Sequence, residues 1–159
     1  MAPATLARLV ATKRFTSKKG DLPMVIRLNT LTILSLFGDV EEVSYGDLGW
    51  ADAEIAQLCQ VLPLCTRVMK LILYKNAISD AGLSALASVF AKGALAQVTY
   101  LFLQENSIGD EGLSALASAC ASGALAQLRS LYVGGNPTSQ QSKDALKTAL
   151  GKTQCTVNF

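Results

Sequence analysis

The sequence contains no histidine among its 159 residues. Histidine activates serine and cysteine nucleophiles and binds zinc beside cysteine, so these nucleophile pairs and mixed Cys/His zinc sites are excluded. A phosphate-binding loop is lacking as well, because Leu146 stands where such a loop ending in Gly151-Lys152-Thr153 needs a glycine. We therefore expect no enzymatic activity, no cofactor and no metal.

Cysteine is present but sparse. The four cysteines show no CxxC spacing, and no secretory signal precedes them. Reduced thiols in a cytoplasmic protein are the resulting expectation. Cys59, Cys65 and Cys120 also occupy places that apolar residues fill elsewhere in the repeat described below. They are therefore predicted to be core residues.

Long apolar runs and a strong charge imbalance are also missing. The most apolar segment, residues 28–37, reads LNTLTILSLF, and it is shorter than the ~18 residues of a membrane-spanning helix. Residues 21–159 hold nine cations against twelve carboxylates, a net charge of −3. We expect neither a membrane span nor a nucleic-acid partner, since the latter needs a basic surface.

The sequence does contain an internal repeat. Residues 76–97 read NAISDAGLSALASVFAKGALAQ, and residues 106–127 read NSIGDEGLSALASACASGALAQ, thirty positions later. Residues 131–136 continue the same spacing, and a shift of 28 brings residues 40–55 onto residues 68–83. A period of this size indicates a stack of similar units, because such repeats bury their apolar faces only against each other.

Each unit combines two apolar periodicities. Residues 71–73 and 101–103 have the alternation of short strands, whereas residues 83–90 and 113–120 have apolar side chains at helical spacing. Stacked units of this kind predict one parallel sheet covered by one layer of helices.

Polar residues and glycines predict how the helices begin and end. Asp52, Asp80 and Asp110 sit just ahead of the expected helices, where each carboxylate would cap the helix that directly follows it. Gly93 and Gly123 stand where the helices should end.

The repeated pattern resembles the leucine-rich repeat family. L-x-x-L-x-L-x-x-N-x-L is read from VMKLILYKNAI, VTYLFLQENSI and LRSLYVGGNPT, and in a degenerate form from VEEVSYGDLGW. The long repeat is similar to the ribonuclease-inhibitor-like type, which includes Ran GTPase-activating protein and NOD-like receptors. The resemblance implies an α/β fold: a short horseshoe-shaped solenoid with parallel strands on the concave side and helices on the convex side. It also implies that Asn76, Asn106 and Asn136 bond the backbone of neighbouring turns.

The repeats suggest a division of the chain. Residues 40–138 carry the repeats, residues 21–39 are expected to cap the first one, and residues 139–159 the last. Residues 1–20 hold five cations and no carboxylate. This basic segment is read as flexible or as a targeting sequence, in which case the chain would enter a mitochondrion or plastid instead of staying in the cytoplasm.

The sheet face away from the helices is the candidate binding surface. Positions between the inward leucines point to this face, and the central column reads Ser44, Ile72, Phe102 and Tyr132. Because strands lie about 4.8 Å apart, the last three should touch in one row. Exposed aromatic residues near charged ones are typical of a protein-binding centre. The predicted partner-binding residues are Ile72, Tyr74, Tyr100, Phe102, Tyr132, Lys70 and Arg129.

Two alternatives to a binding role remain for these aromatic residues. Strand propensity alone favours tyrosine and phenylalanine, and a terminal segment would explain them equally well by covering them. The predicted function is a non-catalytic module that binds a protein or peptide on the concave face. The alternatives are a small GTPase regulator, by resemblance to Ran GTPase-activating protein, and self-association through an exposed sheet edge.

Overall fold

The computed structural model describes residues 40–151 and 154–159. The predicted basic segment 1–20 and the predicted cap 21–39 lie outside these residues. Strands and helices alternate along the chain: β1 (Glu42–Ser44), α4 (Asp52–Val61), the 3₁₀ helix η1 (Leu62–Leu64), β2 (Lys70–Ile72), α5 (Asp80–Ala91), β3 (Tyr100–Phe102), α6 (Asp110–Ala121), β4 (Ser130–Tyr132), α7 (Gln140–Leu150) and β5 (Thr156–Asn158).

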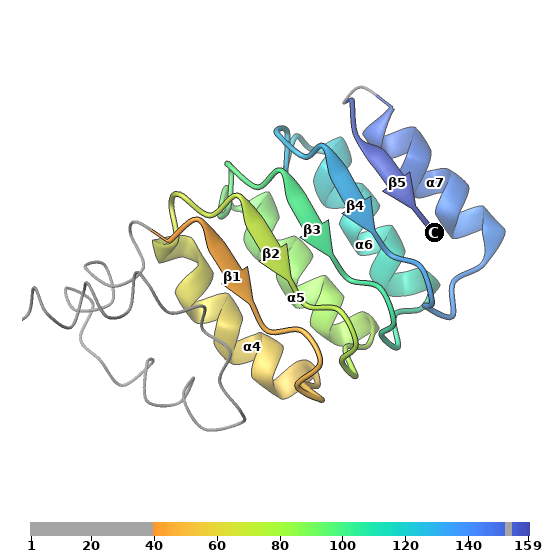
Figure 1. Ribbon diagram of the computed structural model, residues 1–159. Coiled ribbons are helices and arrows are strands. Elements are labelled where there is room, and N and C mark those ends of the chain that lie inside the picture. Colours follow the sequence, from red (N-terminus) through yellow and green to blue (C-terminus); the bar gives the residue numbers. More distant parts are fainter. Residues whose placement is uncertain (1–39, 152–153) are drawn as a thin grey trace, which may run out of the picture.

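The five strands form one parallel sheet in the order β1-β2-β3-β4-β5. Leu71 pairs with Leu101 and Leu101 with Leu131, so the predicted alignment of the repeats is the register of the sheet. Figure 1 shows the helices as a second layer on one face of this sheet. The α/β class and the two-layer solenoid predicted from the repeat are confirmed.

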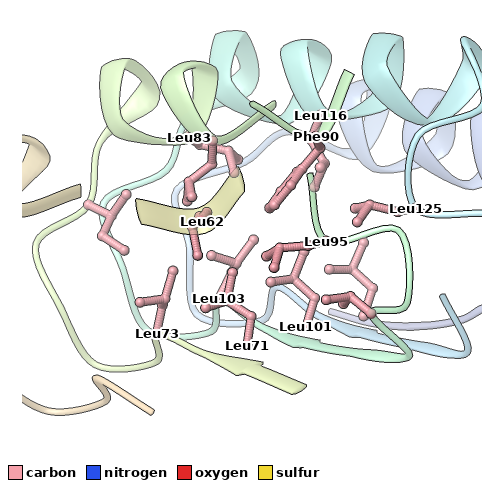
Figure 2. Close-up of a cluster of buried hydrophobic side chains, with 14 of the residues drawn as sticks. Leu62, Leu71, Leu73, Leu83, Phe90, Leu95, Leu101, Leu103, Leu116 and Leu125 are labelled. Atoms are coloured by element: carbon pink, nitrogen blue, oxygen red, sulfur yellow. The ribbon is translucent and has the colours of Figure 1, made fainter. Parts of the chain in front are cut away.

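The core lies between the two layers. Leu71, Leu73, Leu101 and Leu103 point from the strands toward the helices and have no exposed surface. In Figure 2 these leucines face Leu83 and other apolar side chains that come down from the helices. A single repeat could not shield its apolar side chains from water. The stacking of successive repeats buries them, and this burial stabilises the fold.

The asparagine column joins successive repeats. Asn106 is only 7% exposed. Its Oδ1 accepts from Ile78 N (3.2 Å), and its Nδ2 donates to the carbonyls of Leu73 (3.0 Å) and Leu103 (2.9 Å). Asn76 and Asn136 make equivalent bonds to their own neighbouring turns. The predicted structural role of the three asparagines is confirmed, because they satisfy backbone groups that the turns leave unpaired.

The aspartate column works differently from the prediction, which was wrong about the helix that is capped. Asp80 is the first residue of α5, yet its Oδ1 accepts from Gly109 N (2.7 Å) and Gly112 N (2.8 Å), at the start of α6. Asp52 caps α5 in the same way, and Asp110 bonds residues at the start of α7. Each aspartate therefore ties its repeat to the next one. Helix α5 also has a cap within its own repeat, because the hydroxyl of its N-cap residue Ser79 accepts from Ala81 N (3.2 Å).

The predicted helix ends are confirmed. Gly93 follows α5 with a φ of 89°. Its N–H donates to Phe90 O (2.9 Å), and Ala94 N donates to Val89 O (3.2 Å). Gly123 closes α6 with the same pair of bonds and a φ of 95°. Glycine is favoured at both places because it adopts this left-handed conformation without steric cost.

The cysteines are free thiols. Cys65 and Cys120 are buried, as predicted, whereas Cys59 is only partly buried at the edge of the core. Burial raises the pKa of Cys59 to about 11 and that of Cys65 to about 12. These groups therefore stay protonated at neutral pH and are poor nucleophiles.

Candidate protein-binding surface

The sheet face opposite the helices carries the predicted aromatic row. Ile72 is the register partner of Phe102, and Phe102 is the register partner of Tyr132. All three side chains are partly exposed, whereas the inward leucines beside them in the chain are buried. The alternation of a β-strand therefore places the three in one row on this face.

Phe102 and Tyr132 form a stacked pair. Their ring centroids are 4.7 Å apart, and the ring planes differ by 5°. This spacing follows from the distance between adjacent parallel strands, because side chains in register stand nearly perpendicular to the sheet. The two rings therefore form a continuous aromatic wall.

A hollow of about 630 Å³ lies beside this wall. Six of the seven predicted partner-binding residues line it, and Arg129 does not. Arg129 is exposed and precedes β4, outside the hollow. We define the aromatic face as the five uncharged residues of the six. They are Ile72, Tyr74, Tyr100, Phe102 and Tyr132.

Residues of the first repeat complete the hollow. Glu42, Ser44 and Gly46 line it from β1 and the turn that follows. A Cβ atom on Gly46 would come within 2.5 Å of Cε1 of Tyr74, so the Tyr74 ring lies directly against the glycine backbone. These residues were not singled out from the sequence, although they occupy the same outward columns as the predicted ones. Ser44 has a small side chain, and Gly46 makes room for the Tyr74 ring, so the bulkier residues of the neighbouring strands surround the remaining space.

The charges around the hollow are compensated. Lys70 Nζ lies 3.6 Å from Glu42 Oε2 inside the lining. Beyond Tyr74, Lys75 Nζ lies 3.9 Å from Glu105 Oε2, and both side chains are about half exposed. The surface thus combines an apolar centre with charged residues of both signs around it, as protein interfaces commonly do.

Two further features concern chemistry and membranes. Among residues 40–151 and 154–159, no three acidic, cysteine or histidine side chains gather as a metal site would require. Within the same residues, no helix has both the length and the hydropathy needed to cross a bilayer.

Comparison with known proteins identifies the repeat. A family model described as "Leucine Rich repeat" matches residues 65–87 and 98–117. These two segments therefore resemble leucine-rich repeats. The two matched segments contain strands β2 and β3 and the first eight residues of α5 and α6. No curated protein sequence matches the chain.

Three solved structures are similar to the chain at low sequence identity. The structure "Leiomodin-1 Actin-Binding Site 2 (ABS2)" is 16% identical, with a TM-score of 0.65 over 79% of this chain and 73% of that one. A leucine-rich repeat protein of Leptospira interrogans is 16% identical, with a TM-score of 0.39 over 84% and 40%. An internalin from Listeria monocytogenes is 15% identical, with a TM-score of 0.38 over 82% and 44%. At this identity, the first similarity establishes a shared fold and nothing about partners.

Proposed function

We propose that the chain is a non-catalytic interaction module that binds a protein or peptide on the aromatic face. The observation that carries this proposal is the stacked Phe102–Tyr132 pair beside a hollow of about 630 Å³. Aromatic side chains that surround a pocket are the usual centre of a protein interface, because they bury a large area at a small entropic cost. The leucine-rich repeat frame supports this role, since stacked repeats present a continuous, extended surface to a partner.

The finer assignments belong to the same proposal. The thirty-residue period supports the ribonuclease-inhibitor-like type of repeat. The four free cysteines support a reducing compartment such as the cytoplasm. Regulation of a GTPase, the other hypothesis raised by the resemblance, has no particular contact or charge of the described residues in its favour.

Affinity capture with point variants tests the proposal. The wild-type chain is compared with the Phe102→Ala and Tyr132→Ala variants as bait in an extract of the native cell. Truncating a central aromatic residue should cost about 2 kcal/mol, or about a thirtyfold loss of affinity, and the main captured protein should disappear. The matched control is Lys92→Ala, at the exposed end of α5, which should capture as the wild type does. Undiminished capture by both aromatic variants contradicts the proposal.

A further inference from the structure

The backbone of the aromatic face is already paired. β2 and β3 are bonded on both sides, and the bonding continues past the strand ends, where Leu73 N donates to Phe102 O (2.9 Å) and Lys75 N to Gln104 O (3.0 Å). A partner that crosses this face finds side chains but no free peptide groups. An extended strand pressed into the hollow would bury its own N–H and C=O groups without partners, which is costly. A segment with internally satisfied peptide groups avoids this cost.

The spacing of the face fits such a segment. Adjacent strands lie about 4.8 Å apart, and one turn of an α-helix rises about 5.4 Å. A helix that lies across the strands therefore offers about one side chain to each strand along its apolar stripe. Ile72, Phe102 and Tyr132 occupy successive strands in this direction. The small side chain of Ser44 leaves room for a larger apolar residue of the partner at the β1 end.

A row of charges borders the same face. Asp47, Lys75 and Glu105 are exposed and occupy equivalent positions in the turns after β1, β2 and β3. Asp47 N donates to Tyr74 O (2.9 Å) and Lys75 N to Gln104 O (3.0 Å), which keeps the three turns in register. We define these three residues as the charged rim. Its signs alternate as minus, plus, minus from one strand to the next.

We propose that the partner segment is an amphipathic α-helix that lies across the strands with its apolar stripe in the hollow. Its flank over the charged rim carries the complementary order plus, minus, plus at successive turns. This order reads the same in both directions, so it does not depend on which way the helix runs. The inference rests on the proposed function and adds the chemistry of the partner.

Peptide display tests the proposal without knowledge of the natural partner. Random 16-residue peptides are selected on the full chain and counter-selected on the Phe102→Ala variant, whose fold is checked by circular dichroism. The expected peptides share apolar residues at i, i+3 or i+4, and i+7, carry the plus, minus, plus flank, and become helical when bound. Proline-rich peptides, or peptides with alternating apolar residues, would overturn the helix while leaving the proposed function standing.

A charge-swapped variant tests the rim. Exchanging the two charges in K75E/E105K conserves the net charge and preserves an opposite pair. The double variant should bind a selected peptide with about fivefold lower affinity at low salt, whereas Lys92→Ala should bind the same peptide as tightly as the wild type does. An unchanged affinity in K75E/E105K overturns the complementary flank.

Two further outcomes concern the occupant itself. A selection in which no peptide depends on Phe102 overturns both the helix and the proposed function. A dimer in light scattering that Phe102→Ala dissociates would assign the face to a second copy of the chain instead.

Discussion

Between the two central repeats, the segments that contain the helices are more similar in sequence than the segments that contain the strands. Residues 76–97 and 106–127 are identical at sixteen of 22 positions. In residues 68–75 and 98–105, the three buried positions (Val68, Leu71 and Leu73 in the first repeat) are unchanged, and the five other positions all differ. Packing therefore fixes the residues of the frame, whereas the aromatic face is free of that constraint. The face is therefore the place where a function specific to this chain can reside.

The largest contrast is expected between two neighbouring residues of β3. Leu101 is fully buried, so Leu101→Ala should lower the free energy of unfolding by about 3 kcal/mol through lost contacts and a residual cavity. Phe102→Ala removes a partly exposed ring and its stacking contact with Tyr132, and should cost about 1 kcal/mol. Urea unfolding of the two variants measures both values. Equal losses would mean that the aromatic face belongs to the frame.

The bonds between repeats predict an effect of intermediate size. Asp80→Ala removes the acceptor for Gly109 N and Gly112 N and should cost about 1.5 kcal/mol, as the loss of a helix cap does. Asp80→Asn retains an oxygen at this place and should cost less. Amide hydrogen exchange should accelerate at the start of α6. Acceleration confined to the start of α5, where Asp80 itself lies, would refute the link between repeats.

A stabilising change is expected in the turn after β3. Glu105 has a φ of 56°, a value that glycine adopts freely, and Gly135 occupies the equivalent turn with a φ of 71°. Glu105→Gly should therefore stabilise the chain by about 0.5 kcal/mol, since it relieves the backbone and breaks only an exposed ion pair. Thermal unfolding measures the gain. Gly135→Ala, which places a side chain in the equivalent turn, should destabilise the chain. An increase in stability would contradict backbone strain at these positions.

The smallest expected effect is the contribution of Asp110 to the loss of stability at low pH. Asp110 accepts from the Ser142 hydroxyl (2.7 Å) and from Ser139 N (2.7 Å), and these bonds hold its pKa below the ordinary value of 3.8. Its contribution to stability is thus fully present above that value and is lost as the pH falls through the lower pKa of the folded state. Thermal unfolding between about pH 5 and about pH 2 should show a steeper loss for the wild type than for Asp110→Asn. Identical slopes would show that these bonds contribute nothing.

Much of the fold could be predicted because one register is repeated. Once Leu71 is aligned with Leu101 and Leu131, the parallel sheet and the row of Ile72, Phe102 and Tyr132 follow from strand geometry. The target of the aspartates could not be predicted in this way, because Asp80 stands next to the start of its own helix in the sequence. Its carboxylate reaches α6 because Gly112 leaves room: a Cβ atom there would lie 2.6 Å from Asp80 Oδ1.

The candidate site could be predicted in composition but not in shape. The outward columns contain both the aromatic residues and the small ones. The hollow, however, depends on how the Tyr74 ring lies against Gly46 and on the stacking of Phe102 with Tyr132. Arg129 was predicted from its proximity to β4 in the chain, and a side chain before a strand need not point over the face. Side-chain directions of this kind are not encoded in the period of the repeat.

The most direct test measures affinity and stability together in two variants, Phe102→Ala and Asn106→Ala. Phe102→Ala should lower the affinity for the captured partner or for a selected peptide about thirtyfold, and should lower the free energy of unfolding by about 1 kcal/mol. The second leaves buried backbone groups unpaired and should cost about 3 kcal/mol of stability, with an unchanged affinity in the folded protein. The account would be contradicted if the loss of affinity were proportional to the loss of stability in the two variants, or if Phe102→Ala left the affinity unchanged. Either result would mean that binding does not reside in a face separate from the packed frame.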